Sequence, residues 1–328
     1  MPGLGHRGWL ALAGETAFAN NVPNAIGREF IAFTSENFTS IPAYIWPEGV
    51  RAERVTRRKV QGAVKAHGTL AWEADVEDGI GIMLKNTLPL EQFTNLGPGN
   101  GGLHVFTVGD LQLPPSMCFR INRDTIADAT NVWDYVGGRM KKLSFAAAEG
   151  QLLKMTADIS LQKGTPGAGL LAPAYTTQNP LVYHQGTVTV SGVSVPVKSF
   201  KMDIDTGLIE GRGQLGSQFV QQMQPGMYKI QGELDIYFDN MNQVNQFLNA
   251  VDVDITLNFL GTALGTSTRQ LKIEMPTAQF TGNPPTIGNL NEIMIKLPFT
   301  AYRSGNGGIN NIDEAVQISL LNSVQQSF

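Results

Sequence analysis

Few side chains of this sequence are suited to metal or nucleophilic chemistry, and they are widely spaced. The histidines are His6, His67, His104 and His184. Their spacing matches no metal-binding pattern such as H-x-x-x-H or H-E-x-x-H, although assembly in space stays open. The only cysteine, Cys118, stands between Met117 and Phe119, which favours a buried thiol over a nucleophile. We therefore expect no metal and no cofactor.

Other catalytic patterns are equally incomplete. Residues 211–216 match G-x-G-x-x-G, but they open no convincing helix in a βαβ unit, so a Gly-rich turn is favoured over a dinucleotide site. No G-x-S-x-G elbow is present to anchor a hydrolase triad. Asp203 and Asp205 lie two apart, on one face of an expected strand, but nothing indicates the cleft that a glycosidase needs. We expect a protein that is not an enzyme.

Charge is low and unevenly distributed. Charged residues make up 16% of the chain, against about 25% in typical proteins, and the net charge of −4 gives no global nucleic-acid signature. One basic cluster consists of Arg51, Arg54, Arg57, Arg58, Lys59 and Lys65. Residues 203–254 are acidic and include Asp203, Asp205, Glu233 and Asp235. The opposite signs are suited to meeting across a contact between subunits.

Composition favours β structure. Glycine accounts for 36 of 328 residues, above the usual 7% or so, and a low charge fraction also suits a surface shared with neighbours. β-branched and aromatic stretches alternate with Gly, Pro and Asn clusters, as expected for many strands joined by tight turns. No stretch approaches about 18 apolar residues and no signal peptide is apparent, so we expect no membrane anchor.

A repeat organises these strands. Residues 62–84 recur at 226–248 without a gap, at one offset (226 − 62 = 164), which is half the chain. The matched pairs include Gly62 with Gly226, Lys65 with Lys229, Gly68 with Gly232, Leu70 with Leu234, and Asp75 with Asp239. Each copy continues into a short apolar helical stripe, at 80–88 and 244–251, with the aspartate in its N-cap region. A fixed period of this kind indicates tandem related domains.

The repeat predicts a division into two domains. We assign residues 1–165 to a first domain, with an N-terminal arm and a long loop near 50–60, and residues 186–328 to a second. Residues 166–185, which overlap a Gly, Pro, Ala, Thr and Gln-rich break at 164–179, form the linker or a long loop. The fold class we expect is mainly β, as two tandem sandwich or barrel domains with one short flanking helix each. The chain is long enough for two cores or for one large core.

The order of these segments resembles the tail tube protein, or major tail protein, family of long-tailed bacteriophages, in a tandem-duplicated form. The resemblance rests on segments 14–18 (GETAF), 29–37 (EFIAFTSEN), 68–73 (GTLAWE), 271–276 (LKIEMP) and 318–322 (ISLLN), and on the arginines at 51, 54 and 57. It covers residues 14–322, and it consists of strand and turn patterns rather than chemical motifs.

The resemblance implies a structural virion protein whose rings stack into a hollow tube for genome passage. Two tube-like domains per chain favour a trimeric, pseudo-hexameric ring, while a ring of six chains with the second domain outside stays open. The implied partners are further copies, the tape measure protein, tail-end proteins and, in a contractile tail, a sheath. Double-stranded DNA would pass without specific binding, and assembly would occur in the host cytoplasm before the protein resides in the virion tail.

Two groups of residues are candidates for these roles. Arg51, Arg54, Arg57, Arg58 and Lys59, in the loop near 50–60, are expected at contacts between subunits or rings. Asp203, Asp205, Glu233 and Asp235 are expected to face the lumen, because a neutral or acidic lining does not hold phosphates. The loop at 164–179 is a second candidate for reaching a neighbouring ring. The alternatives are another ring-forming component, such as a terminator, baseplate ring or contractile-system inner tube, and a β-sandwich carbohydrate-binding module.

Overall fold

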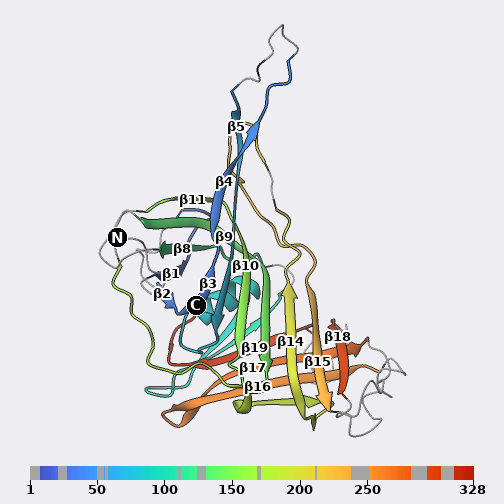
Figure 1. Ribbon diagram of the computed structural model, residues 1–328. Helices are drawn as coiled ribbons and strands as arrows, with labels where there is room; N and C mark the ends of the chain where they lie inside the picture. The colour runs from blue at the N-terminus through green and yellow to red at the C-terminus, as the bar shows by residue number, and fades with distance from the viewer. Residues whose placement is uncertain are drawn as a thin grey trace.

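The computed structural model describes residues 8–20, 28–49, 55, 58–109, 112–123, 131–167, 171–210, 213–237, 251–281, 294–303 and 314–328. These residues form 19 strands and one α-helix, and every strand pairing is antiparallel (Figure 1). The mainly β prediction is therefore confirmed. The strands make three connected layers, which we call the main, covering and small sheets.

The main sheet joins the two halves of the chain. Across the layer its strands are β4 (Thr39–Ile45), β5 (Val60–Glu73), β10 (Lys154–Leu161), β9 (Val132–Ala148), β14 (Val197–Asp205), β15 (Lys229–Tyr237) and β18 (Met294–Ala301). A further strand, β3 (Phe33–Glu36), pairs with β5 on the same side as β4. Strands β9 and β14 pair from Ala148–Ser199 to Lys142–Asp205, so the sheet continues from one half into the other.

The covering sheet crosses the main sheet, as the differing strand directions in Figure 1 show. Its strands in order are β13 (Val193–Ser194), β12 (Gly186–Val190), β16 (Val253–Leu264), β17 (Ser267–Phe280), β19 (Gln317–Asn322), β7 (Gly102–Thr107) and β6 (Leu90–Asn95). The end of β17 turns into the main sheet, where residues 278–280 pair with 299–301 of β18. This strand therefore forms a corner between the two layers.

The small sheet belongs to the first half of the chain. It contains β11 (Lys163–Pro166), the first part of β9, β8 (Met117–Asn122), β1 (Trp9–Gly14) and β2 (Glu29–Ile31). Strand β9 passes from this sheet into the main sheet at Gly137, whose φ of 67° is a left-handed conformation that favours glycine. A Cβ at Gly137 would lie 2.7 Å from the Cβ of Gln162, so the bend also requires a residue without a side chain.

One apolar core lies between the layers. The inward residues of the main and covering sheets belong to a single buried cluster drawn from both halves of the chain. Phe200 of β14 and Phe259 of β16 illustrate the contact, with ring centroids 5.8 Å apart. The repeated residues Leu70 and Leu234 are both fully buried, and each such burial stabilises the fold by about 1.5–3 kcal/mol. The chain has the one large core that its length allows.

The sequence repeat is also a repeat of strand pairing. The corresponding pairs are Phe33–Trp72 and Val197–Ile236, Ser35–Ala71 and Ser199–Asp235, and Ile45–Val60 and Ile209–Gln224. Every residue lies 164 positions after its counterpart (197 − 33 = 164). A β-bulge separates the first pair from the second in both halves. Unrelated halves would rarely share both a strand register and a bulge. Because related structures retain their bulges, the shared bulge indicates that the two halves of the chain are related.

The predicted helices have different outcomes. The first is α1 (Ile80–Thr87), whose N-cap is Gly79. Asp75 does not cap it, since its side chain instead accepts the backbone N–H of Glu77 in the turn before the helix. Of the second helical stripe, at 244–251, only Val251 lies within the described residues, and it is outside any helix or strand.

The segments beside the expected long loops are regular. Residues 50–54, 56 and 57 of the loop near 50–60 lie outside the described residues, but the flanking β4 and the start of β5 form a long hairpin that projects from the body (Figure 1). The Gly-rich break begins with β11, and the later described part of the connection, residues 171–185, ends in the 3₁₀ turn η3 (Tyr183–Gln185). Leu181 forms backbone hydrogen bonds with Ala74 and Leu153, which fixes this connection to the first half.

Candidate functional site

The β4–β5 hairpin, which we call the first arm, exposes an unusual set of apolar side chains. They are Ile41, Tyr44, Ile45, Trp46, Val55 and Val60. In a soluble protein a concentration of exposed apolar residues marks a surface that other molecules cover. Among the described residues, no strand pairs with the outer edge of β3 or β4. An open strand edge is likewise a template for association with another chain.

Two of the basic residues predicted at subunit contacts lie on this arm. Arg58 and Lys59 are exposed just before β5, while Arg51, Arg54 and Arg57 lie outside the described residues. The Lys59 ammonium lies 5.1 Å from the centre of the Trp46 ring and 5.4 Å from that of Tyr44. Cation–π contacts of this kind hold the aromatic rings beside the charge. The arm therefore combines basic and aromatic groups on one exposed surface.

A second arm, residues 206–228, was not predicted. It connects β14 to β15 and runs along the first arm (Figure 1). The backbone N–H of Val64 donates to the carbonyl of Gln218 at 2.8 Å, and the Gln162 side chain donates to the carbonyl of Val220 at 2.9 Å. By the offset of 164, the pair Ile209–Gln224 at its base corresponds to Ile45–Val60 of the first arm. The register thus identifies it as the counterpart of the first arm.

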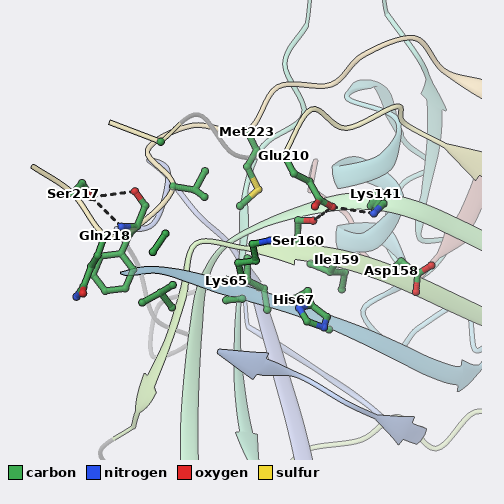
Figure 2. Close-up of a pocket in the computed structure, with 18 of the residues that line it drawn as sticks. Lys65, His67, Lys141, Asp158, Ile159, Ser160, Glu210, Ser217, Gln218 and Met223 are labelled. Carbon is green, nitrogen blue, oxygen red and sulfur yellow. Dashed lines mark hydrogen bonds and ion pairs between the residues drawn. The ribbon is translucent and has the colours of Figure 1, made fainter. Parts of the chain in front are cut away.

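A cavity of about 600 Å³ lies between the two arms and the body. Figure 2 shows Glu210 of the second arm directed toward Ser160 of β10 and Lys141 of β9. The Ser160 hydroxyl donates to Glu210 at 2.6 Å, and the Lys141 ammonium lies 3.0 Å away. Burial opposes ionisation of Glu210, but these two partners outweigh it and lower its pKa. The group is a stable carboxylate that anchors the arm, and it is poorly suited to general-base chemistry, which favours a pKa near neutrality.

The acidic residues predicted for the lumen share one face of the main sheet. Asp203 and Asp205 lie on β14, and Glu233 and Asp235 lie on the neighbouring β15. Lysines on the adjacent strands β9 and β18 pair with three of these acids. Lys142 lies 2.8 Å from Asp203, and Lys296 lies 3.2 Å from Glu233 and 3.7 Å from Asp235. Partial burial opposes ionisation of Asp203, but Lys142 outweighs it and lowers its pKa. The structure therefore brings the four acids together on a face of nearly balanced charge.

The remaining candidate groups occupy separate places. Cys118 is buried in β8, and burial raises its pKa to about 12, as expected for an unreactive thiol. His67 lies on β5 and His184 in η3, while His6 lies outside the described residues. His104 is buried between Glu91, at 2.9 Å, and the carbonyl of Val324, at 3.2 Å. Residues 213–216 of the Gly-rich motif belong to the second arm.

A group of carboxylates lies at a second cavity, of about 420 Å³, lined in part by Glu29, Glu77 and Asp78. Burial raises the pKa of Glu29 to about 7 and that of the nearby Asp75 to about 6, and the neighbouring carboxylates add to both shifts. Glu91 behaves oppositely. Burial opposes its charge, but the hydrogen bond with His104 and others outweigh burial and lower its pKa to about 2.

These shifts predict a stability maximum near pH 5. Between about pH 4.5 and 7 the folded chain holds a proton on Glu29 that the unfolded chain releases, so stability falls as the pH rises through this range. Glu91 stabilises the fold above about pH 4.5, and this contribution is lost as the pH falls toward 2. Thermal unfolding should therefore give a higher midpoint at pH 5 than at pH 8. Glu29→Gln should reduce that difference without changing the acid side, and an undiminished difference would contradict the assignment.

Open strand edges and exposed apolar arms are features of structural proteins that associate with other chains. The family described as phage tail tube protein matches residues 5–301, which is most of the sequence. The chain therefore belongs to the phage tail tube protein family, and it is a structural component of a phage tail. A comparison with curated proteins gave no significant match. Among the described residues, no helix is long and apolar enough to cross a membrane.

Proposed function

We propose that this chain is a tail tube subunit with two related domains, and that three copies form each ring. The repeated register and bulge support two domains that occupy equivalent positions. The pairing of β9 with β14 supplies a contact between domains that a ring can repeat between chains. A ring of three chains then contains six similar units.

The open edge of the first domain supports ring closure. Strand β14 corresponds to β3 and β4 by the offset of 164, and its outer edge pairs with β9. In the described part of the chain, the same edge of β3 and β4 has no strand partner. The second domain of the next copy would pair there. Such a head-to-tail contact closes a ring when its rotation is a simple fraction of a turn.

The first arm and the connection at 164–179 are the proposed links between rings. The arm projects beyond the body and carries exposed apolar and basic side chains, including Trp46 and Lys59. Stacking would bury these groups against the next ring. The tube would then grow with the tape measure protein inside it and tail-end proteins at its ends, during assembly in the host cytoplasm.

The charged face of the main sheet is the proposed lumen lining. Asp203, Asp205, Glu233 and Asp235 would face the DNA, with the neighbouring lysines neutralised by ion pairs. A lining with no net excess of cations releases few counterions from phosphates and lets the duplex pass without specific binding. The function is thus structural, and the carboxylate Glu210 acts as an anchor of the second arm.

Self-assembly of the purified protein tests this function. Negative-stain electron microscopy over a range of protein concentrations should show hollow tubes of variable length. The observation that carries the proposal is the repeated strand register that ends in an open edge. A chain that stays monomeric at every concentration would contradict it.

A further inference from the structure

The contact between the two arms is a contact between the two repeats. Phe219 and Gln218 of the second arm lie against the edge of β5, where Val64 donates its backbone N–H to Gln218. Ala63 and Phe219 line the same cavity, and Lys163 holds its ammonium 5.8 Å from the centre of the Phe219 ring. Within one chain, the arm of the second repeat therefore rests on the arm of the first.

The offset of 164 identifies the corresponding positions. The counterpart of Ala63 is Met227, and the counterpart of Phe219 is Val55. Both counterparts are strongly exposed, Met227 at 83% and Val55 at 81% of its surface. Phe219 is only partly exposed beside the first arm, whereas Ala63 is itself exposed, next to the Val64 contact. Val55 therefore stands free where its counterpart Phe219 is partly covered, and Met227 stands free next to Tyr228, the counterpart of Val64.

The surface around Met227 is held in a fixed conformation. The backbone N–H of Gly226 donates to the carbonyl of Thr206 at 3.1 Å. A Cβ at Gly226 would lie 2.4 Å from the carbonyl oxygen of Gly207, so the two sides of the arm approach closely there. Leu215, farther along the same arm, is also fully exposed. An apolar surface that is exposed and already ordered is suited to binding without a large entropic penalty.

We propose that the first arm of one copy lies along the second arm of a neighbouring copy in the same ring, with Val55 beside Met227. The arms of a ring would then form a continuous circle, in which each arm lies against the preceding one. Contacts within one chain would alternate with contacts between two chains. This inference rests on the proposed ring of three chains, since only equivalent repeats carry the contact across a chain boundary. The occupant of the Met227 surface is a second copy of this chain.

Cross-linking through introduced cysteines tests the contact. The test protein carries Val55→Cys and Met227→Cys, is assembled, and is treated with a short bismaleimide reagent. Native Cys118 is buried and its pKa is raised to about 12, so it gives little background. We expect covalent dimers and trimers, and no larger species, because a ring of three closes on itself. Val55→Cys with Pro225→Cys provides a second pair if the first impairs folding.

Matched variants separate the outcomes. Ala63→Cys with Phe219→Cys should cross-link within one chain and leave its mass unchanged, and each single-cysteine variant should give no trimer. The same samples are viewed by electron microscopy. Tubes without cross-linked trimers would overturn the arm contact while leaving the proposed function in place. A ladder reaching six chains would contradict the ring of three, and absence of any ring would contradict the proposed function together with this inference.

Discussion

Tube formation should be lost when residues 46–59 of the first arm are replaced by Asn-Gly. Ile45 and Val60 are paired across the hairpin, so a two-residue turn can join them without changing the strands. The replacement removes the exposed Trp46 and Val55 and the basic residues between 51 and 59, which we propose to contact neighbouring copies. We expect no tubes in electron micrographs at concentrations at which the unmodified protein polymerises.

The shortened chain should remain folded. The buried part of β5 begins at Val64, beyond the segment removed, and surface changes away from the core alter stability by about 0.5 kcal/mol or less. Its thermal midpoint should therefore match that of the unmodified protein. Val193→Ser, at an exposed apolar residue outside both arms, serves as the control and should form normal tubes. Normal tubes from the shortened chain would show that the first arm has no role in assembly.

Genome release should slow strongly when Asp203, Asp205, Glu233 and Asp235 are all replaced by lysine. Each replacement adds two positive charges, so the formal charge of a chain changes from −4 to +4. Lys142 and Lys296 would also lose their ion-pair partners. Contacts between these cations and phosphates would retain the DNA, and the retention should weaken as the salt concentration rises. The measurement is the rate of DNA release from assembled particles.

Replacement of the same four residues by Asn and Gln provides the graded control. It removes four negative charges and adds no cation, so the formal charge changes from −4 to 0. Release should therefore be slower than in the unmodified particle and faster than in the lysine variant. Electron microscopy must show intact tails in all three. Equal release rates in the three particles would exclude these residues from the lumen.

Much of the fold could be predicted from the sequence, because local pattern determines it. Alternation of apolar residues predicts strands where β5 and β14 lie, and the apolar stripe from Ile80 predicts a helix where α1 lies. The helix N-cap was wrong because Asp75 is used in a turn that precedes the helix. The joining of both halves through β9 and β14 was not predictable, since it depends on pairing between residues far apart in sequence, from Ala148 with Ser199 to Lys142 with Asp205. The bend at Gly137 likewise depends on where two sheets meet.

For the candidate surfaces, too, local pattern could be predicted from the sequence, and contacts between distant strands could not. The shared face of the four acids follows from the two-residue period of β14 and β15. Their lysine partners Lys142 and Lys296 come from other strands, and therefore required the sheet order. The second arm was not predicted, because its composition is that of a loop. The repeat offset was the available signal, since it maps residues 206–228 onto the first arm.

The most direct test of the central claim is the number of chains in each ring, measured by cryo-electron microscopy of tubes assembled from the purified protein. We expect three chains around a hollow axis. Their six repeats should alternate, and β3 and β4 of each chain should adjoin the second repeat of its neighbour. Six chains per ring, with the second repeat on the outside, would contradict it.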